Sequence, residues 1–158
     1  MSTDRPDHAG VRFPPPLIFL GLTLAGPLLD RLLGLAPLDL ERPVRIVLVL
    51  AFIAVGLALV LAAIRRFLRA GTRVEPWAPS SAIVSDGIYR FTRNPMYVGM
   101  ALVMIGLALI IGSPASLAMV AVAVIVVDRY VIRREEAYLV QKFGTDYTNY
   151  RRRVRRWL

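Results

Sequence analysis

Apolar residues in this chain come in long, nearly uninterrupted blocks that are separated by short polar segments. The blocks cover residues 17–35, 44–64, 96–112 and 115–132. A helix needs about 20 residues to cross the hydrocarbon core of a bilayer, which is roughly 30 Å thick. The second block is long enough and has no charge after Arg45, whereas the first is weaker because Pro27 interrupts it. The pattern predicts an all-α integral membrane bundle of about four transmembrane helices.

The polar segments divide this single expected domain into four parts. We expect a first hairpin over residues 17–64, a connector over 65–95, a second hairpin over 96–132 and a tail over 133–158. The tripeptide Gly112-Ser113-Pro114 is a turn signal between the last two blocks. The tail is predicted to begin as a helix over residues 133–143. Gly144 would end this helix, because glycine is common just after helix C-termini.

Positive charge is distributed very unevenly over the expected loops. With four spans, the connector and both termini share one side, which holds 17 of the 20 Lys and Arg residues. The other side has only three, namely Arg31, Arg42 and Arg45. Because cytoplasmic loops carry the excess of Lys and Arg, we expect the connector and both termini in the cytoplasm. The preference for Arg over Lys favours a bacterial source with a GC-rich genome, and therefore the inner membrane.

The net charge of +9 does not require a nucleic-acid partner. The most basic segment, residues 150–157 (YRRRVRRW), follows directly on the expected membrane region. Cations in this position are attracted to anionic lipids by about 1 kcal/mol each. We therefore expect anionic lipids at the basic tail and no nucleic acid. The sequence indicates no oligomeric state.

The composition excludes several kinds of chemistry. The chain has no cysteine, and its one histidine, His8, lies near the N-terminus. Thiolate nucleophiles, cysteine metal sites and a histidine-based triad are therefore excluded, and we expect no metal centre. The chain also has no Gly-rich loop that follows a strand, so a soluble Rossmann-type nucleotide site is not expected.

Two polar clusters bracket the second hairpin and therefore meet at the same membrane surface. The first is residues 87–99 (GIYRFTRNPMYVG), and the second is residues 133–136 (RREE). Ionisable residues at a membrane boundary are costly, which favours a function for them. Arg93 offers a planar fork that suits a carboxylate. Glu135 and Glu136 diverge by about 100° on a helix, so we expect one to face the bundle and the other to pair outward with Arg133 or Arg134.

Each cluster also has a purely structural interpretation. Tyr89 and Tyr97 are typical interfacial anchors, and the tail carboxylates alone indicate a salt-bridged helix end. Gly99, one turn inside the third block, permits close approach of a ligand or of another helix. Taken together, the clusters match a zwitterionic ligand with its anionic group at Arg93 and its cationic group at Glu135 or Glu136.

The compound pattern resembles the isoprenylcysteine carboxyl methyltransferase family and its relatives, the phospholipid methyltransferases. That family has an Arg-His-Pro-x-Tyr-x-Gly stretch, a helical hairpin, then Glu-Glu and a Phe-Gly-x-x-Tyr-x-x-Tyr tail. The resemblance covers about residues 82–157, and the matching positions are Arg93, Pro95, Tyr97, Gly99, Glu135, Glu136, Phe143, Gly144, Tyr147 and Tyr150. The first hairpin matches only as generic membrane spans.

The resemblance implies a membrane-embedded methyltransferase that uses S-adenosylmethionine from the cytoplasm and a lipophilic substrate from the bilayer. Arg93 would hold the cofactor carboxylate, and Glu135 or Glu136 its ammonium group or ribose hydroxyls. The implied cofactor-binding set is Tyr89, Arg93, Asn94, Tyr97, Gly99, Glu135 and Glu136, and no catalytic residue is assigned. Asn94 stands where the family often has histidine, and because Asn takes up no proton at neutral pH, a proton-transfer role is not carried over.

Several alternatives remain open at this point. The acceptor is a prenylated cysteine, a phospholipid amine, as in a phospholipid N-methyltransferase, or a small lipophilic acid or thiol. A non-enzymatic multi-span subunit would need only the spans and their anchors. A small transporter would want charged or broken helices at mid-membrane, which the second and third blocks lack.

Overall fold

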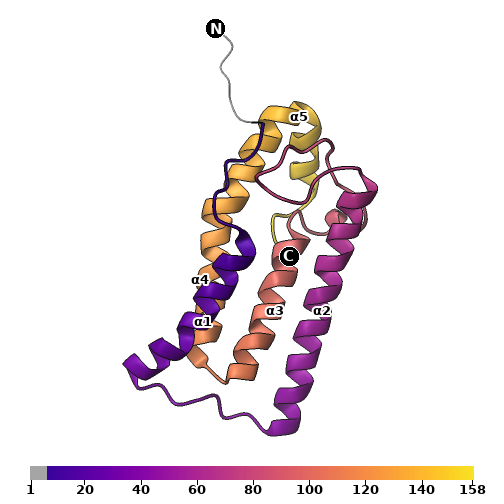
Figure 1. The fold of residues 1–158 in the computed structure, drawn as a ribbon. Coiled ribbons are helices and arrows are strands. Elements are labelled where there is room, and N and C mark those ends of the chain that lie inside the picture. Colours follow the sequence, from indigo (N-terminus) through magenta and orange to yellow (C-terminus); the bar gives the residue numbers. More distant parts are fainter. Residues whose placement is uncertain (1–6) are drawn as a thin grey trace.

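The computed structural model describes residues 7–158, and all regular structure in this part of the chain is helical (Figure 1). Arg5, one of the 17 cations expected on the cytoplasmic side, lies outside the described residues. The elements are α1 (Pro15–Leu33), α2 (Arg42–Arg69), the 3₁₀ turn η1 (Gly87–Arg90), α3 (Pro95–Ile111), α4 (Pro114–Val126), the π-helix η2 (Val127–Ile132) and α5 (Arg133–Arg153). The predicted all-α class is confirmed.

Helix starts and lengths follow the apolar blocks closely. Each of the first four α-helices has a proline in its first turn, where the missing N–H is tolerated. Within residues 7–158, three helices are long and apolar enough to cross a membrane: α1, α2 and the continuous helix formed by α4, η2 and α5. Helix α3 is apolar throughout but has only 17 residues. The chain therefore folds as a membrane helical bundle.

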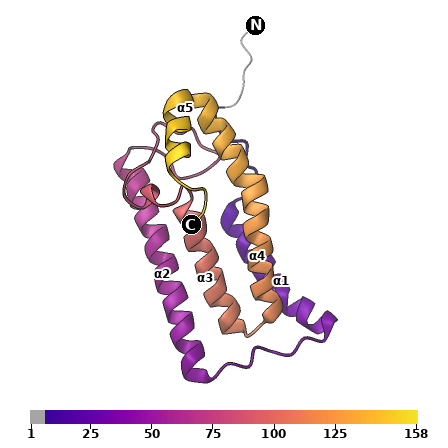
Figure 2. The ribbon, with the colours of Figure 1, turned by 180° about the vertical axis from the view of Figure 1, so that it is seen from behind.

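The helices pair in an order that differs from the expected first hairpin. Helix α2 packs along α3, whereas α1 packs along α4 (Figures 1 and 2). Residues 34–41, which connect α1 to α2, run across one end of the bundle. The segment 17–64 is therefore not a packed hairpin, since its two helices lie on opposite sides of the α3–α4 hairpin.

Small residues explain which helices pair. In α1, a side chain at Gly26 would overlap Ser116 of α4, and the Ser116 hydroxyl donates to the carbonyl of Thr23 at 2.9 Å. In α2, a Cβ atom on Gly56 would lie 2.7 Å from the carbonyl oxygen of Gly99 in α3. A Cβ on Gly99 would lie 2.6 Å from the carbonyl oxygen of Gly56. Absence of both side chains lets the two backbones touch.

The tail helix is broken at Gly144, the residue at which the sequence predicted its end. This residue has φ 55° and ψ −122°, so the helical geometry of α5 is broken there. The sequence did not predict the helical segment that follows Gly144 up to Arg153. This segment turns back toward the start of α3 (Figure 2). The C-terminal residues are thereby brought beside the first polar cluster.

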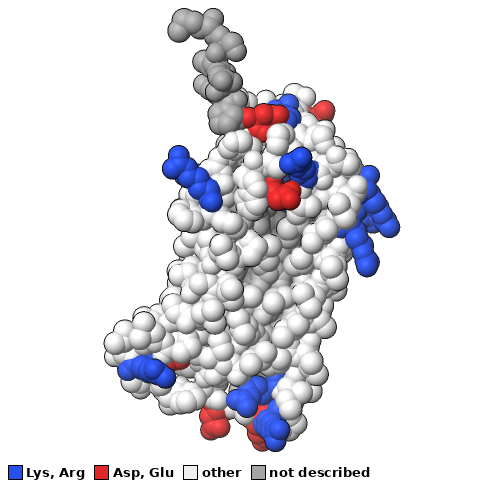
Figure 3. Space-filling view, viewed as in Figure 1, with Lys and Arg blue, Asp and Glu red and all other residues white. Residues whose placement is uncertain are grey.

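On the face shown in Figure 3, charged side chains gather toward the two ends of the bundle, and the surface between them is almost free of charge. Large apolar side chains on the outer faces of α1 and α2 are exposed, among them Leu17, Leu24, Leu28, Val47, Leu50 and Leu61. An apolar band of this kind is what the hydrocarbon core of a bilayer requires.

Candidate functional site

A pocket opens at the end of the bundle where the connector, the start of α3 and α5 meet. It encloses about 850 Å³, including the part that opens to solvent. One wall consists of connector residues between Arg73 and Val84, and the opposite wall comes from η1, the start of α3 and α5. No group of three or more His, Cys, Asp and Glu residues suited to a metal ion occurs within residues 7–158.

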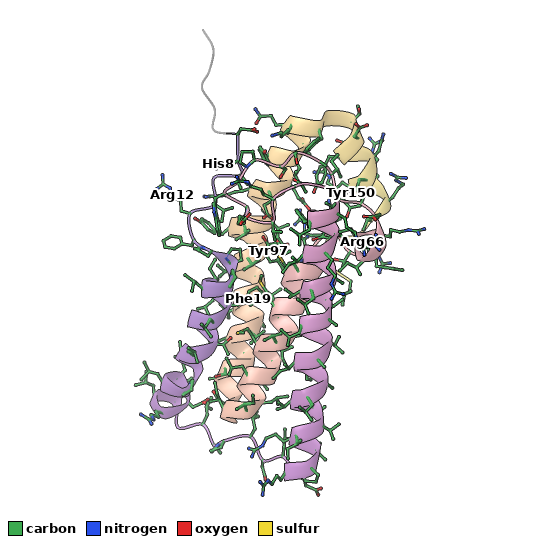
Figure 4. All side chains as sticks on the ribbon, turned by 45° about the vertical axis from the view of Figure 1, so that its right-hand side comes forward. His8, Arg12, Phe19, Arg66, Tyr97 and Tyr150 are labelled. Carbon is green, nitrogen blue, oxygen red and sulfur yellow. The ribbon has the colours of Figure 1, made fainter. Side chains whose placement is uncertain are left out.

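Six of the seven predicted cofactor-binding residues line this pocket. They are Tyr89, Arg93, Asn94, Tyr97, Glu135 and Glu136. Figure 4 shows Tyr97 and Tyr150 toward the same end of the bundle. Gly99 is the exception, because it lies against Gly56 at the contact between α2 and α3. The structure therefore corrects the assignment of Gly99: its missing side chain serves helix packing.

Arg93 is buried in the pocket wall with unused hydrogen-bonding capacity. Its side chain is 9% exposed, and its Nη1 atom lies 3.1 Å from Oε1 of Glu136. That contact is an ion pair without hydrogen-bond alignment, since neither Nε nor Nη1 has a hydrogen-bond partner in the described part of the chain. Buried donors without a partner are rare and indicate a missing ligand, ion or water.

Glu136 is neutralised by a second arginine from the C-terminal tail. Arg156 donates from Nε to Oε1 at 3.1 Å and from Nη2 to Oε2 at 2.6 Å. Its Nη1 reaches Asp128 of η2 at 3.3 Å. The hydrogen bond to Glu136 raises the pKa of Arg156 above its ordinary value. Glu136 therefore belongs to a buried ion-pair network that joins the start of α3, α5 and the tail.

Glu135 has a different partner. The Tyr97 hydroxyl donates to its Oε1 at 2.8 Å, and no lysine or arginine of residues 7–158 forms an ion pair with it. Of the two adjacent carboxylates, Glu135 is thus the one whose charge is left without a cation.

The expected outward pairing of one carboxylate with Arg133 or Arg134 is not observed. Arg133 lies 3.9 Å from Asp128, and Arg134 stacks over the ring of Tyr130 at 4.4 Å. Both glutamates instead turn inward, because α3 and the returning tail offer partners on both sides of α5. This corrects the prediction that only one of them faces the bundle.

Tyrosine side chains provide much of the remaining pocket wall. The ring of Tyr89 is buried and packs against Phe67 with ring centres 5.6 Å apart. The Tyr150 hydroxyl donates to the carbonyl of Tyr89 at 2.8 Å, and the Tyr147 ring packs edge-on against Tyr150. Burial raises the pKa of Tyr89 far above its ordinary value, so its hydroxyl keeps its proton.

The C-terminal tail is joined by hydrogen bonds to the polar cluster before α3. The backbone N–H of Arg93 donates to the carbonyl of Arg155 at 2.9 Å. The Asn94 amide and the Thr92 hydroxyl both donate to the carbonyl of Arg156, at 2.9 and 3.1 Å. Asn94 thus acts as a donor to the tail.

Sequence reasoning missed Arg156 as a site residue, because it is one of several arginines in a basic run. The alternation of exposed and half-buried residues from Arg153 to Arg156 reflects a short extended segment after α5, which the letters YRRRVRRW do not reveal. Trp157, whose Nε1 donates to Asp128 at 3.0 Å, was also missed. Through Arg156, Asp128 is linked to Glu136.

Sequence reasoning also missed Tyr138, whose hydrogen bonds hold the connector beside the pocket. The backbone N–H of Ser80 in the connector donates to the hydroxyl of Tyr138 at 3.0 Å. The Tyr138 hydroxyl in turn donates to the carboxylate of Asp7, which also accepts from Lys142 at 2.6 and 2.8 Å. Tyr138 therefore holds the connector and the N-terminal segment against α5.

Comparison with known proteins places most of the chain within one family. Residues 44–146 match the family model described as "Phospholipid methyltransferase". A stretch of 63 residues is 36% identical to an uncharacterized protein of Haemophilus influenzae and covers 40% of this chain and all of that protein. A stretch of 72 residues, 46% of this chain, is 36% identical to a protein-S-isoprenylcysteine O-methyltransferase of Schizosaccharomyces pombe, of which it spans 30%. No solved structure matches the chain.

Proposed function

Because the chain belongs to the phospholipid methyltransferase family, it is a membrane methyltransferase, and we propose that S-adenosylmethionine is its methyl donor. We further propose that the acceptor is lipophilic and reaches the site from the bilayer. Transfer takes place at the cytoplasmic membrane surface, in the pocket between the connector and α5.

The observation that carries this proposal is the presence of Arg93 and Glu135, two residues of opposite charge, in one pocket. The two side chains line one pocket, where, among residues 7–158, Arg93 has buried donors without partners and Glu135 forms no ion pair with a cation. The amino-acid part of S-adenosylmethionine carries a carboxylate and an ammonium group. Arg93 is suited to the carboxylate through its planar fork, and Glu135 to the ammonium. Glu136 is the weaker candidate for the ammonium because two arginines already surround it.

Methyl transfer requires mainly that the methyl donor and the acceptor be aligned. S-adenosylmethionine supplies an activated methyl group on a sulfonium, and transfer to an acceptor is a single in-line displacement. Fixing donor and acceptor in line lowers the barrier by several kcal/mol. The rings of Tyr89, Tyr97 and Tyr147 line the pocket and are suited to lie against a positively charged sulfonium. The connector lines one side of the pocket, which narrows its opening to water.

The acceptor class is supported by the apolar part of the pocket wall. Phe67 from the end of α2, Met96 from the start of α3 and Ile132 at the end of η2 all face the pocket, next to the membrane-facing part of the bundle. A carboxylate, an amine and a thiol all remain open as the accepting group. The yeast relative is named for isoprenylcysteine, whereas the description of the matched family favours a phospholipid amine as the second candidate.

The exposed tail cations support a further expectation about lipids. Arg151, Arg152, Arg153 and Arg155 are exposed, whereas Arg156 turns inward. We propose that the exposed four face anionic lipids of the cytoplasmic leaflet. Nucleic acid is not required to explain them.

Calorimetry on the detergent-purified protein tests the proposed cofactor. Both S-adenosylmethionine and its demethylated product should bind, since they share the carboxylate and the ammonium. A screen with the methyl-labelled cofactor against lipid extracts then identifies the acceptor. Absence of binding to either compound would leave a non-enzymatic membrane subunit as the better description.

A further inference from the structure

Glu136 lies between two arginines that reach it from different parts of the chain. Arg156 takes both of its oxygens in a forked pair at 3.1 and 2.6 Å. Arg93 approaches Oε1 to 3.1 Å but makes no aligned hydrogen bond. All three side chains are at least two-thirds buried, so water screens the interactions of the two arginines with Glu136 less than it would at the surface.

Arg156 is itself held firmly in this place. Its third nitrogen reaches Asp128 at 3.3 and 3.4 Å, and the next residue, Trp157, donates to the same carboxylate at 3.0 Å. Its carbonyl accepts hydrogen bonds from Thr92 and Asn94, the two residues that flank Arg93. The tail therefore fixes Arg156 and Arg93 relative to each other.

A lone arginine beside a buried carboxylate forms a forked pair with it, because two parallel charge-assisted bonds are the strongest available arrangement. Arg93 is close enough to Glu136 to do so. Arg156 instead holds the forked position on Glu136, and the Nε and Nη1 atoms of Arg93 have no hydrogen-bond partner in the described part of the chain.

We propose that Arg156 is a positioning residue which, by occupying Glu136, keeps the guanidinium of Arg93 free to bind the carboxylate of the ligand in the pocket. This inference rests on the proposed function, in which that ligand is S-adenosylmethionine. Without Arg156, the guanidinium of Arg93 turns into a closed pair with Glu136 and is lost to the ligand.

The test compares two ligands that differ only in the group that Arg93 would bind. Binding of S-adenosylmethionine and of decarboxylated S-adenosylmethionine is measured by calorimetry for the parent, for Arg156→Gln and for Arg155→Gln. We expect Arg156→Gln to weaken binding of the complete cofactor at least tenfold and to change binding of the decarboxylated compound less than threefold. Arg155→Gln, next to it in the same extended segment but exposed, should bind both like the parent.

A second variant guards against a simple loss of folding. Arg156→Gln combined with Glu136→Gln removes the competing carboxylate together with its partner, so no unpaired buried carboxylate remains at position 136. We expect this double variant to bind the complete cofactor at least five times more tightly than Arg156→Gln alone, or, if the single variant does not fold, within threefold of the parent.

The outcomes separate the two proposals. If the parent binds neither compound, the proposed function fails and the positioning role falls with it. If the parent binds but Arg156→Gln weakens both compounds equally, Arg156 is only structural and the inference is overturned. Parent-like binding by Arg156→Gln, or a double variant that is as weak as the single one, overturns it as well.

Discussion

Two adjacent glutamates at the start of α5 show how strongly position decides the role of a residue. Glu136 is buried in an ion-pair network with Arg93 and Arg156. Within residues 7–158, the side chain of Glu135 accepts one hydrogen bond, from the hydroxyl of Tyr97. Removing one partner of a buried ion pair costs about 3–5 kcal/mol, because the other charge is left without compensation. Substitutions at the two positions should therefore have different consequences.

Glu135→Gln should fold normally and bind S-adenosylmethionine roughly tenfold more weakly, because a charged hydrogen bond is worth about 1.5–3 kcal/mol. Glu136→Gln should instead lower the temperature of unfolding in detergent, since it leaves Arg93 and Arg156 without their shared carboxylate. Calorimetry and thermal unfolding monitored by circular dichroism measure the two effects. Equal effects of both substitutions on stability would contradict this division of roles.

Arg93→Lys separates ligand binding from an anchoring role. Lysine keeps the positive charge beside Glu136, so insertion and folding should be preserved. It lacks the planar fork, so affinity for S-adenosylmethionine should fall by about tenfold. Arg155→Lys is the matched control and should bind like the parent, because its side chain is exposed in the tail. Parent-like binding by Arg93→Lys would leave Arg93 as an interfacial anchor.

At the scale of helices, the site depends on how closely α2 and α3 pack. The end of α2 contributes Phe67 to the pocket, and the start of α3 contributes Asn94, Met96 and Tyr97. Their relative position is fixed by the contact between Gly56 and Gly99, where the backbones touch. A side chain added at this contact would clash with backbone atoms, which cannot move aside without separating the helices.

Gly99→Ala should therefore destabilise the bundle, even though alanine is a better helix former by about 1 kcal/mol. The added Cβ would lie 2.6 Å from the carbonyl oxygen of Gly56, so the helices must separate. Gly21→Ala in α1 is the matched control, because no atom lies within 4 Å of its added Cβ. Thermal unfolding should show a lower midpoint for Gly99→Ala and an unchanged or higher one for Gly21→Ala. A midpoint for Gly99→Ala at or above that of the parent would contradict the packing role.

At the scale of the whole molecule, α5 and the connector, which line the pocket, lie at one end of the bundle, and residues 34–41 lie at the other (Figure 1). The end with the pocket carries most of the arginines, which predicts that it faces the cytoplasm. The cofactor would then enter from the cytoplasm, and the acceptor from the membrane.

The absence of cysteine allows a direct test of this orientation. Ser85→Cys places a single thiol on the exposed connector, and Asp39→Cys places one on the exposed loop at the opposite end. In intact cells, a membrane-impermeant maleimide should label Asp39→Cys and not Ser85→Cys. After lysis both should react. The reverse pattern in intact cells would place the pocket outside the cytoplasm.

Much of this architecture follows from local properties of the sequence. Hydropathy set the apolar helices, prolines marked their starts, and Gly144 marked the break in α5. The two polar clusters were predicted to meet because a short turn at Gly112 brings both ends of a hairpin to one membrane surface. Six residues of the candidate set line one pocket for this reason.

Only the tertiary structure decided which residues pair across the bundle. The rotation of α5 determines that Glu135 meets Tyr97 while Glu136 meets Arg93, and a pattern of residue types does not encode that rotation. The selection of Arg156 from a run of arginines depends on the chain reversal at Gly144. Contacts between residues far apart in sequence, such as Asn94 and Arg156, form only when several helices settle together. For this reason the sequence by itself determined the helical class and the place of the site, whereas the packed structure decided which helices pair and which arginine forms the forked pair with Glu136.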